Sequence, residues 1–550
     1  MLIFPKKIFS LIVFGLFLVI HAALVGQVHM VTIGTNAGPG SLRAAIDSAN
    51  ARPGPDTITF SLAGPPPFVI NTTTQLPDII DSLTVIDATT QPGYVFGNVI
   101  LDGITATGYY HALEVMELAS GFELYGLYVR NFHHANLSGS GIFVKATGAI
   151  IGKPGKGNIF TGNRHGILIG AHRSRGLAIQ SNYVGIEPDG ITVHSNARNG
   201  IYLAPYSGST DGTFIIGGNR LLGEGNLVGG NGWSNLGINA KAIVQGNDIG
   251  TNASQTLNWG NGWNIIPGFN LNNVSIRRYT ENSLIGGDSP EFGNVIGYGR
   301  SSGILVQTTK NVTIKSNIIF RNGQSGDAGI NMFTTDSILI TNNSFYCNSS
   351  GIRFSSANQN KAAPIITTAL STSIIGSASP GDSIEVFAVD TSGCSILACQ
   401  GRTFLGGTVA NASGAWTING SFTFDIVTAI ASNSSANRSS RFATCRPLDY
   451  ILEQKTQPES PLAAKQTGFQ LFPNPAKDAV SFILPHAEKS AVWRLSIFAS
   501  DGKVVLSKHI TTGPDIEKYS LPLEDFMPGI YRVKLQHNNQ RYAQTLLIIR

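Results

Sequence analysis

Aromatic residues in loops rich in asparagine and glycine are the side chains best suited to chemistry in this sequence. These residues are Trp233, Trp259, Trp263 and Tyr279. The segment 258–264, Asn-Trp-Gly-Asn-Gly-Trp-Asn, is typical of their surroundings. An aromatic ring packs on the CH face of a sugar, and an Asn side chain can hydrogen-bond to its hydroxyls. The chemistry predicted from these residues is therefore the binding of a glycan.

Two adjacent arginines, Arg277 and Arg278, lie near these aromatic residues in the sequence. A guanidinium group matches the geometry of a carboxylate, so the pair could attract acidic glycans. The alternative is that the aromatic rings only fill loops against the body of the protein, and the sequence alone favours this alternative. The predicted ligand-binding set is Trp233, Trp259, Trp263, Tyr279, Arg277 and Arg278.

Residues that could catalyse polysaccharide cleavage are scarce, and no catalytic residue is assigned. Hydrolysis needs two carboxylates at a defined separation. A lyase needs a base and a group that neutralises the sugar carboxylate, such as Arg, Lys or bound Ca²⁺. Glu187 and Asp189 lie in a turn, where capping of backbone N–H groups is expected. The other candidates, for which structural or surface-loop roles are expected, are Asp87, Asp102, His133 and His134. No Cys/His spacing predicts a metal site.

A repeated phrase built around asparagine predicts the scaffold that positions these side chains. It recurs at Asn158, Asn182, Asn226, Asn247, Asn294, Asn317 and Asn343. The gaps are 24, 44, 21, 47, 23 and 26 residues. The two long gaps are close to twice the short ones, which predicts that each skips one turn of a coil. A fixed period of this size indicates stacked structural units.

Short alternating β segments occupy each unit, with no helical pattern between them. Coiling the chain would stack the Ile, Val and Leu side chains of successive turns about 4.8 Å apart. Asn tolerates the left-handed backbone of a tight turn, and stacked Asn side chains can hydrogen-bond along the axis. The repeat therefore predicts a parallel β-helix of about eleven turns. Residues 41–50 predict a short amphipathic helix that closes its N-terminal end.

Several phrases in the first part of the chain carry a resemblance to a known family. They are 38–46 (Gly-Pro-Gly-Ser-Leu-Arg-Ala-Ala-Ile), 56–60, 76–77, 86–87, 91–94 and 101–103. Together with the repeat, they resemble secreted right-handed parallel β-helix proteins of the pectin-lyase-like superfamily, over roughly residues 30–354. The resemblance implies the fold and allows action on acidic polysaccharides, but a fold by itself does not determine an activity.

The start of the chain predicts export. Lys6 and Lys7 precede an apolar run from Ile8 to Ile20, and small residues follow as far as Gly26. This pattern is typical of a cleaved signal peptide over 1–26. A membrane anchor would need about 20 apolar residues. No later segment is apolar enough to span a bilayer.

The composition fits this class of protein. Charged residues make up 13% of the chain, glycine occurs 63 times, and the net charge is +5. The hydrophobic share of 42% argues against disorder. Because no basic block carries interleaved aromatic residues, nucleic acid is not a predicted partner.

The remaining sequence predicts two further β modules joined by a linker. Residues 361–445 carry short strands that suit an Ig-like β-sandwich, and their phrases resemble bacterial Ig-like modules. Residues 446–467 suit a linker. Disulfide pairing stays open among Cys347, Cys394, Cys399 and Cys445, although a bridge within the 361–445 module is expected.

Residues 468–550 predict a small β-sandwich and carry a second resemblance. Its motifs are Pro473-Asn474-Pro475, the Asp501-Gly502 turn, the phrase 529–535 (Gly-Ile-Tyr-Arg-Val-Lys-Leu) and the apolar terminal strand. They resemble the type A C-terminal sorting domain of the type IX secretion system of Bacteroidetes. The resemblance implies that the protein crosses the outer membrane with this domain as its signal, and that it is then released or attached to the cell surface.

The sequence thus predicts an all-β chain: a right-handed parallel β-helix over 27–360, an Ig-like β-sandwich, and a C-terminal β-sandwich that binds the type IX secretion machinery. Two functions stay open. The favoured one is noncatalytic binding of an extracellular polysaccharide or cell-surface glycan without a cofactor. The other is a polysaccharide lyase or glycoside hydrolase, with Ca²⁺ as cofactor in the lyase case.

Overall fold

The computed structural model describes residues 26–134, 137–170, 176–204, 212–262, 271–354, 361–390, 394, 398–448, 469–474, 476–483, 491–499, 504–512, 518–537 and 540–548. The expected signal peptide and most of the expected linker lie outside these residues. The chain divides into two compact units, 1–390 with 396–450, and 391–395 with 451–550. Each unit is described by itself.

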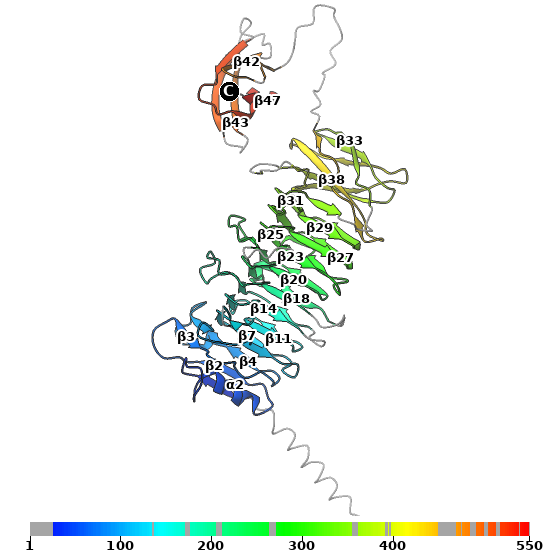
Figure 1. The fold of residues 1–550 in the computed structure, drawn as a ribbon. Helices are drawn as coiled ribbons and strands as arrows, with labels where there is room; N and C mark the ends of the chain where they lie inside the picture. Colours follow the sequence, from blue (N-terminus) through cyan, green and yellow to red (C-terminus); the bar gives the residue numbers. More distant parts are fainter. Residues whose placement is uncertain are drawn as a thin grey trace, which may run out of the picture. The chain divides into compact units, whose positions relative to one another are not determined.

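The first unit is dominated by three long parallel sheets (Figure 1). Sheet A has eleven strands: β1 (Val28–Val31), β2 (Thr57–Phe60), β4 (Val85–Asp87), β7 (Glu123–Tyr125), β12 (Ile150–Ile151), β15 (Ala178–Ile179), β18 (Phe214–Gly217), β21 (Ala242–Gln245), β24 (Leu284–Gly286), β27 (Lys310–Lys315) and β30 (Asp336–Thr341). Sheet B has ten: β3 (Phe68–Asn71), β5 (Val99–Asp102), β8 (Tyr128–Arg130), β13 (Ile159–Thr161), β16 (Tyr183–Val184), β19 (Leu227–Val228), β22 (Asp248–Ile249), β25 (Val295–Gly297), β28 (Ile318–Phe320) and β31 (Ser344–Tyr346). Sheet C has nine: β6 (Leu113–Val115), β11 (Ile142–Val144), β14 (Ile167–Ile169), β17 (Ile201–Leu203), β20 (Leu236–Ile238), β23 (Val274–Ile276), β26 (Ile304–Gln307), β29 (Ile330–Phe333) and β32 (Ile352–Phe354).

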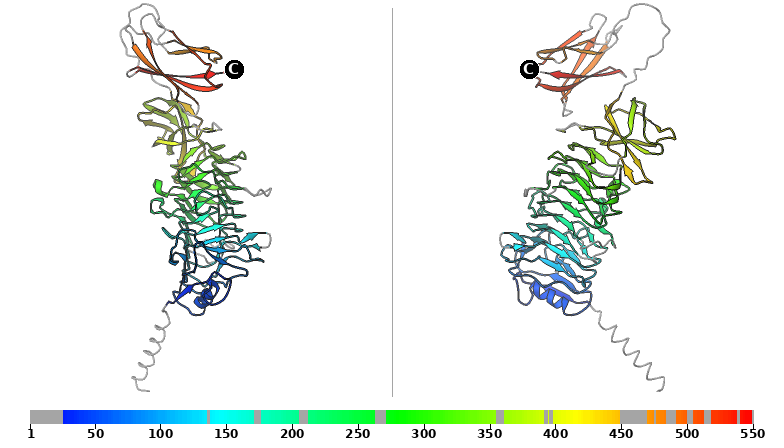
Figure 2. Two further views of the ribbon diagram at one scale, coloured as in Figure 1. Left: turned by 90° about the vertical axis from the view of Figure 1, so that its left-hand side faces the viewer. Right: turned by 45° about the vertical axis from the view of Figure 1, so that its right-hand side comes forward.

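From β4 onward the chain visits sheets A, B and C in the same order in every turn, which is the arrangement of a parallel β-helix. Figure 2 shows the turns of this unit stacked one upon another. Side chains of successive turns form continuous buried rows. One row in sheet A is Ile58, Ile86, Leu124, Ile151, Ile179, Ile216, Val244, Ile285, Ile314 and Ile340, each at most 1% exposed. Burial of each such side chain contributes about 1.5–3 kcal/mol. The predicted fold class is confirmed.

An asparagine ladder runs between sheets A and B, through the repeated Asn residues predicted to stack. The side-chain amide of each Asn donates to the side-chain oxygen of the next, from Asn158 to Asn343, at 2.9–3.0 Å. The predicted skipped turns are wrong. Asn182 bonds directly to Asn226 at 3.0 Å, and Asn247 bonds directly to Asn294 at 2.9 Å. The additional residues form loops within a single turn, because a loop that leaves and rejoins the coil does not alter the pairing of the strands.

A second ladder, which the sequence analysis did not predict, lies between sheets B and C. It links Asn196, Asn231, Asn235, Asn273, Asn322 and Asn348 through side-chain hydrogen bonds of 2.8–3.1 Å. These Asn residues are at most 2% exposed. Each ladder satisfies polar groups that could not otherwise be buried in the coil.

At the N-terminal end, helix α2 (Leu42–Asn50) buries Leu42, Ala45, Ile46 and Ala49. It is the helix at the blue end of the ribbon (Figure 1). Ser41 is its N-cap, and the Ser41 hydroxyl accepts a hydrogen bond from the Ala44 N–H at 3.2 Å. The helix therefore covers the first turn of the coil.

At the C-terminal end, two antiparallel sheets share one apolar core and form a β-sandwich module (residues 361–448). One contains β33 (Ile365–Ala369), β34 (Ser373–Ser377) and β37 (Ala415–Asn419). The other contains β35 (Ser383–Ala388), β36 (Thr403–Val409), β38 (Ile426–Asn433), β39 (Arg438–Ser439) and β40 (Arg446–Pro447). Cys399 and Cys445 form a disulfide within the module. Cys347 and Cys394 are disulfide-bonded as well.

The β-sandwich module closes the last turn of the coil through polar contacts. The Ser439 hydroxyl accepts from the Ile340 N–H at 2.8 Å and donates to the Ile340 carbonyl at 2.9 Å. Glu385 accepts from the Asn342 N–H at 2.9 Å. These contacts take the place of a further turn, so the end of the β-helix is not left open.

The second unit consists of two antiparallel sheets over its own apolar core. The smaller sheet contains β41 (Gln470–Phe472), β42 (Ala479–Ile483) and β45 (Lys518–Pro522). The larger contains β44 (Val504–Thr512), β43 (Ala491–Ala499), β46 (Gly529–His537) and β47 (Gln540–Ile548), in that order. Antiparallel β structure at the C-terminus thus follows the β-helix, as predicted.

Candidate functional site

The surface beside sheet C carries a group of cationic and aromatic side chains outside the cores. Loops that connect sheet B to sheet C supply most of them, and the outer face of sheet C supplies the rest. The two longest of these connections follow β16 and β22, where the chain makes its largest excursions from the regular turn. The residues of this surface therefore come from turns that are neighbours in space but distant in sequence.

A cationic row (Arg164, Arg198, Trp233, Asn261 and Arg300) runs from turn to turn along these loops. The Arg198 N–H donates to the Arg164 carbonyl at 2.7 Å, and the Trp233 N–H donates to the Arg198 carbonyl at 3.0 Å. The Asn261 side-chain amide donates to the Trp233 carbonyl at 2.6 Å, and the Arg300 N–H donates to the Asn261 side chain at 3.3 Å. Backbone and amide contacts thus fix the order of the row along the axis.

Stacking fixes the orientation of the side chains in this row. The Arg198 guanidinium lies 4.5 Å from the centre of the Trp233 ring, and that of Arg164 lies 5.5 Å from the Tyr109 ring. Such cation–π contacts are worth about 0.5–2 kcal/mol, depending on exposure. They place each guanidinium group beside an aromatic ring, and Arg164 also donates a hydrogen bond to the Tyr109 hydroxyl.

His165 packs beneath the row and is held neutral. Its ring stacks on Tyr202, with centroids 5.3 Å apart, and meets Trp233 edge-on at 6.4 Å. Burial, and then repulsion from Arg164 and Arg198, lowers the pKa of His165 to about 3. Its Nδ1 atom is buried and has no hydrogen-bond partner among the described residues. The pKa values of His111 and His133 are also lowered, in each case mainly by burial.

The positive charge of this surface is not balanced locally. Within the described part of the chain, the groups whose charge shifts the pKa values of His165, His133 and Arg198 are arginines, histidines and tyrosines, with no carboxylate among them. The nearby Glu114 is paired with Lys145 at 2.7 Å. An anionic ligand would therefore approach a surface with a positive electrostatic potential.

A first pocket, of about 160 Å³, opens on the outer face of sheet C. It is lined by Asn199, Tyr202, Trp233, Ser234, Gly237, Asn239, Ser275 and Arg277. Gly237 is required by geometry, because a Cβ at this position would come within 2.8 Å of the Tyr202 ring. The absent side chain lets the ring lie across the sheet and form one wall of the pocket.

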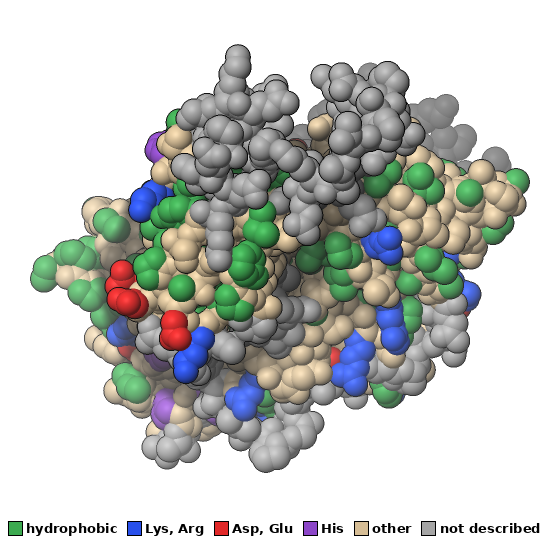
Figure 3. Space-filling view, turned by 90° about the horizontal axis from the view of Figure 1, so that it is seen from above, with side chains coloured by type: hydrophobic (Ala, Val, Ile, Leu, Met, Phe, Trp, Pro, Cys, Tyr) green, Lys and Arg blue, Asp and Glu red, His purple; other side chains and the backbone are tan. Residues whose placement is uncertain are grey.

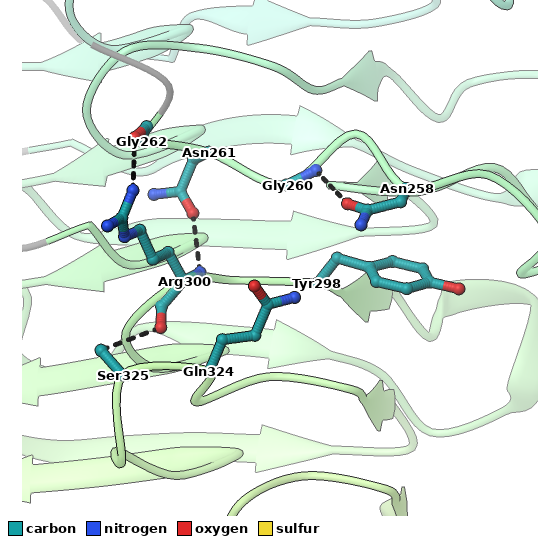
Figure 4. Close-up of a pocket in the computed structure, with 8 residues that line it drawn as sticks. All are labelled: Asn258, Gly260, Asn261, Gly262, Tyr298, Arg300, Gln324 and Ser325. Carbon is teal, nitrogen blue, oxygen red and sulfur yellow. Dashed lines mark hydrogen bonds between the residues drawn. The ribbon is translucent and has the colours of Figure 1, made fainter. Parts of the chain in front are cut away.

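A second pocket, of about 290 Å³, lies at the Arg300 end of the row (Figure 4). It is lined by Asn258, Gly260, Asn261, Gly262, Tyr298, Arg300, Gln324 and Ser325. Figure 4 shows the Asn261 side chain beside the Arg300 backbone, and Tyr298 and Gln324 on the opposite side from the Asn258–Gly260 segment. Asn261 contacts both Trp233 and Arg300, so it connects the two pockets along the row.

The structure brings together only part of the predicted binding set. Trp233 and Arg277 line the first pocket. Trp259 is 3% exposed, and its indole N–H donates to the Ile191 carbonyl at 2.9 Å, so it packs under a loop. Arg278 and Tyr279 are exposed in the turn from sheet C to sheet A, away from the row. Trp263 lies outside the described residues.

The acidic candidates occupy a different surface, over sheet B. Asp189 accepts from the N–H groups of Ile191 and Thr192, both at 2.8 Å, which is the expected capping role. The side chain of Glu187 instead accepts from the Tyr128 hydroxyl at 2.6 Å and lies 2.8 Å from His194 Nδ1. The side chain of Glu187 therefore does not cap backbone N–H groups as predicted. The turn folds back onto the outer face of sheet B, and this brings Glu187 to Tyr128.

Two further candidates have structural partners. Asp102 pairs with Arg130 at 2.8 Å. The backbone of Asp87 flanks a short 3-10 turn, and its carboxylate caps the Thr89 N–H at 3.0 Å. His133 and His134 form strand β9, which pairs with β10 (Leu137–Ser138) in a small hairpin. On the face seen in Figure 3, charged side chains are scattered among uncharged and hydrophobic ones.

The residues of this surface that were not predicted from the sequence are Arg164, His165, Arg198, Tyr202 and Arg300. A usable signal was present in the first three turns of the row. Arg164, Arg198 and Trp233 each stand three residues before the first residue of a sheet C strand. A search for charged or aromatic residues at a fixed distance from the Gly-Ile phrases would have found two of them.

Comparison with protein-family models identifies the second unit. Residues 470–549 match the model described as the secretion system C-terminal sorting domain. The predicted sorting domain is confirmed, and it indicates export to the cell surface or the extracellular space. No curated protein matches the chain. Within the described part of the chain, no helix is long and apolar enough to cross a membrane.

Solved structures similar to this chain share little sequence with it. Tailspike protein 2 of Escherichia coli O157:H7 bacteriophage CAB120 is 10% identical, over 92% of this chain and 65% of the tailspike chain, with a TM-score of 0.38. This chain therefore spans less than two thirds of the tailspike chain. Dimeric latent PorU of Porphyromonas gingivalis is 12% identical, over 35% of this chain and 19% of that chain, with a TM-score of 0.13.

Proposed function

We propose that this exported protein binds an acidic polysaccharide along the cationic row beside sheet C. The observation that carries the proposal is the stack of Arg164, Arg198 and Trp233 in three consecutive turns, with no carboxylate among the charges acting on Arg198. Arginine binds the carboxylates of a uronic acid, and the indole face of Trp233 suits a sugar ring.

The spacing of the row supports a polymer rather than a single sugar. Successive turns of a β-helix repeat about every 4.8 Å. Cationic and aromatic groups that recur at this interval can contact several residues of a chain lying along the axis. The two pockets at Trp233 and Arg300 would each receive a sugar ring, because each is lined by polar side chains and at least one aromatic ring.

The test is a binding assay with the purified full chain on polygalacturonate, alginate and a neutral β-glucan. Charged hydrogen bonds are worth about 1.5–3 kcal/mol each, so Arg164→Ala/Arg198→Ala is expected to weaken binding to the acidic polymers by about 100-fold or more. Arg278→Ala/Lys310→Ala removes the same charge from exposed positions outside the row and is expected to bind as the unaltered chain does. Equal loss in both variants would reject the row as the binding site.

One observation favours a second candidate, a polysaccharide lyase. His165 is neutral, its Nδ1 has no partner among the described residues, and it lies beneath Arg164 and Arg198. β-Elimination requires a base beside groups that neutralise a sugar carboxylate, and His165 meets the second condition better than the first, because its low pKa makes it a weak base. The lyase would release unsaturated products from a uronic-acid polymer, and His165→Ala would abolish them. Binding without such products supports the noncatalytic function.

A further inference from the structure

On the outer face of the larger sheet of the sorting domain, the charged side chains of the strands are all positively charged. Alternate residues of its strands point inward, and Trp493, Leu495 and Ile497 of β43 are at most 2% exposed. The residues between them therefore point outward. On the outer face lie four basic residues from three strands, Arg494 on β43, Arg532 and Lys534 on β46, and Arg541 on β47.

Strand register brings these four residues together. Lys534 pairs with Ser496, and Arg532 pairs with Phe498. Gln536 stands between Arg494 on one neighbouring strand and Arg541 on the other. Arg494 and Arg541 are therefore each diagonal to Lys534, within reach of long side chains. Arg532 lies two residues from Lys534 on the same strand and so on the same face.

The charges of this face repel one another. The sequences of β43, β44, β46 and β47 contain no Asp or Glu. The pKa of Lys534 is lowered, mainly by burial and then by repulsion from Arg532 and Arg541. Its ammonium group lies 4.7 Å from the centre of the Phe498 ring, so the cation is held against the sheet. Soluble surfaces usually intersperse both signs, and a field of one sign suits the attraction of a partner.

The opposite sheet of the same domain has a different character. Ser481 of β42 and Ser520 of β45 pair with each other in register. They flank Phe482 and Leu521, which are buried. Ser481 and Ser520 consequently lie on the outer face of the smaller sheet, whose three strands contain one charged residue, Lys518. The two faces of the domain therefore differ in charge, not only in shape.

We propose that the outer face of the β44-β43-β46-β47 sheet docks on an acidic protein surface of the outer-membrane export machinery. Charge complementarity specifies the sign of the partner, and steering by charge speeds a correct encounter. Phe498, Ile530 and Leu547 on the same face supply apolar area, as the centre of a protein interface requires. This inference concerns the sorting domain alone and does not depend on glycan binding.

The test is export of the full chain in a bacterium that carries a type IX secretion system. Arg532→Glu/Lys534→Glu reverses the centre of the face and is expected to lower the extracellular fraction by about tenfold or more, with accumulation in the periplasm. Arg532→Lys/Lys534→Arg keeps the charge and is expected to be exported normally. Ser481→Glu/Ser520→Glu adds two acids to the opposite sheet and is also expected to be exported. Normal export of the reversed variant, or equal loss in the opposite-sheet variant, overturns the proposal.

Further measurements separate docking from misfolding and from lipid binding. Thermal unfolding of the purified full-length variants must show that the sorting domain of Arg532→Glu/Lys534→Glu still folds. A photo-crosslinking residue at position 496 should capture an outer-membrane protein that position 481 does not. Reversal of acidic residues on that protein to lysine should restore export of Arg532→Glu/Lys534→Glu. Failure to restore it overturns the proposal, as does charge-dependent binding to anionic phosphatidylglycerol vesicles in place of a protein.

Discussion

Gln400 of the β-sandwich module ends the second asparagine ladder by binding Asn348 of the last turn. The Asn348 side-chain amide donates to Gln400 Oε1 at 2.7 Å, and Gln400 Nε2 donates to the Asn348 carbonyl at 2.6 Å. Gln400 is 2% exposed. A residue from outside the coil thus occupies the position of the next rung, so that the ladder has no unsatisfied end.

Gln400→Leu is expected to destabilise the first unit. The substitution leaves the amide of Asn348 buried without the acceptor that Gln400 supplies, at a cost of about 1–3 kcal/mol. Urea unfolding followed by circular dichroism measures the change. Gln324→Leu, at an exposed position, is the matched control and should leave the free energy of unfolding nearly unchanged.

Loss of an interior rung is expected to cost more than loss of the terminal one. Asn294 accepts from both the backbone and the side chain of Asn247, and its amide donates to Asn317 and to the Val244 carbonyl. Asn294→Leu would therefore leave several buried groups without partners, and we expect about 3–5 kcal/mol of destabilisation. A smaller effect than that of Gln400→Leu in the same unfolding assay would contradict the view of the ladder as a continuous network.

Arg198→Lys should separate charge from stacking in glycan binding. Lysine keeps the positive charge but loses the planar group that lies 4.5 Å from the Trp233 ring. We expect affinity for an acidic polymer between that of the unaltered chain and that of Arg198→Ala. Isothermal titration at low and high salt measures this, since the purely electrostatic part should fade with added salt. Equal affinities for Arg198→Lys and the unaltered chain would show that stacking contributes nothing.

His165 should make the β-helix less stable in acid. Its pKa is lowered from the ordinary 6.5 to about 3 in the folded protein, so below pH 6.5 the unfolded chain takes up a proton that the folded chain does not. Stability is therefore lost as the pH falls from about 6.5 toward 3, by about 1.4 kcal/mol per unit for this group. His165→Phe keeps a ring beside Tyr202 and removes the titration. Identical pH dependence of unfolding in both proteins would contradict the assignment.

The fold was predictable because the Asn phrase and the Gly-Ile phrase recur with their flanking residues. The first ladder followed from the same phrase. The second ladder did not, because residues such as Asn196 and Asn235 have no common flanking pattern, and Gly299 replaces one rung. The predicted skipped turns failed since a loop's length says nothing about where the chain rejoins the coil.

The binding surface was harder to predict than the scaffold. Its chemistry changes from turn to turn, from Arg164 to Trp233 to Asn261, so no repeated letter marks it. Trp233 and Arg277 were identified by residue type, but Trp259 has the same type and sequence context and is buried beneath a loop. Only the three-dimensional path of the loops distinguishes a ring that faces a pocket from one that fills a gap.

The direct bond between Asn182 and Asn226, across 44 residues, has an evolutionary consequence. Insertions at the corners of the coil leave the ladder and the strand pairing of adjacent turns untouched. Lineages can therefore lengthen, shorten or exchange the loops that carry Arg198 and Trp233 without redesigning the rod beneath them. In such a scaffold the codons of the strands and the ladder must stay constant, whereas the codons of the corner loops can change as the ligand changes.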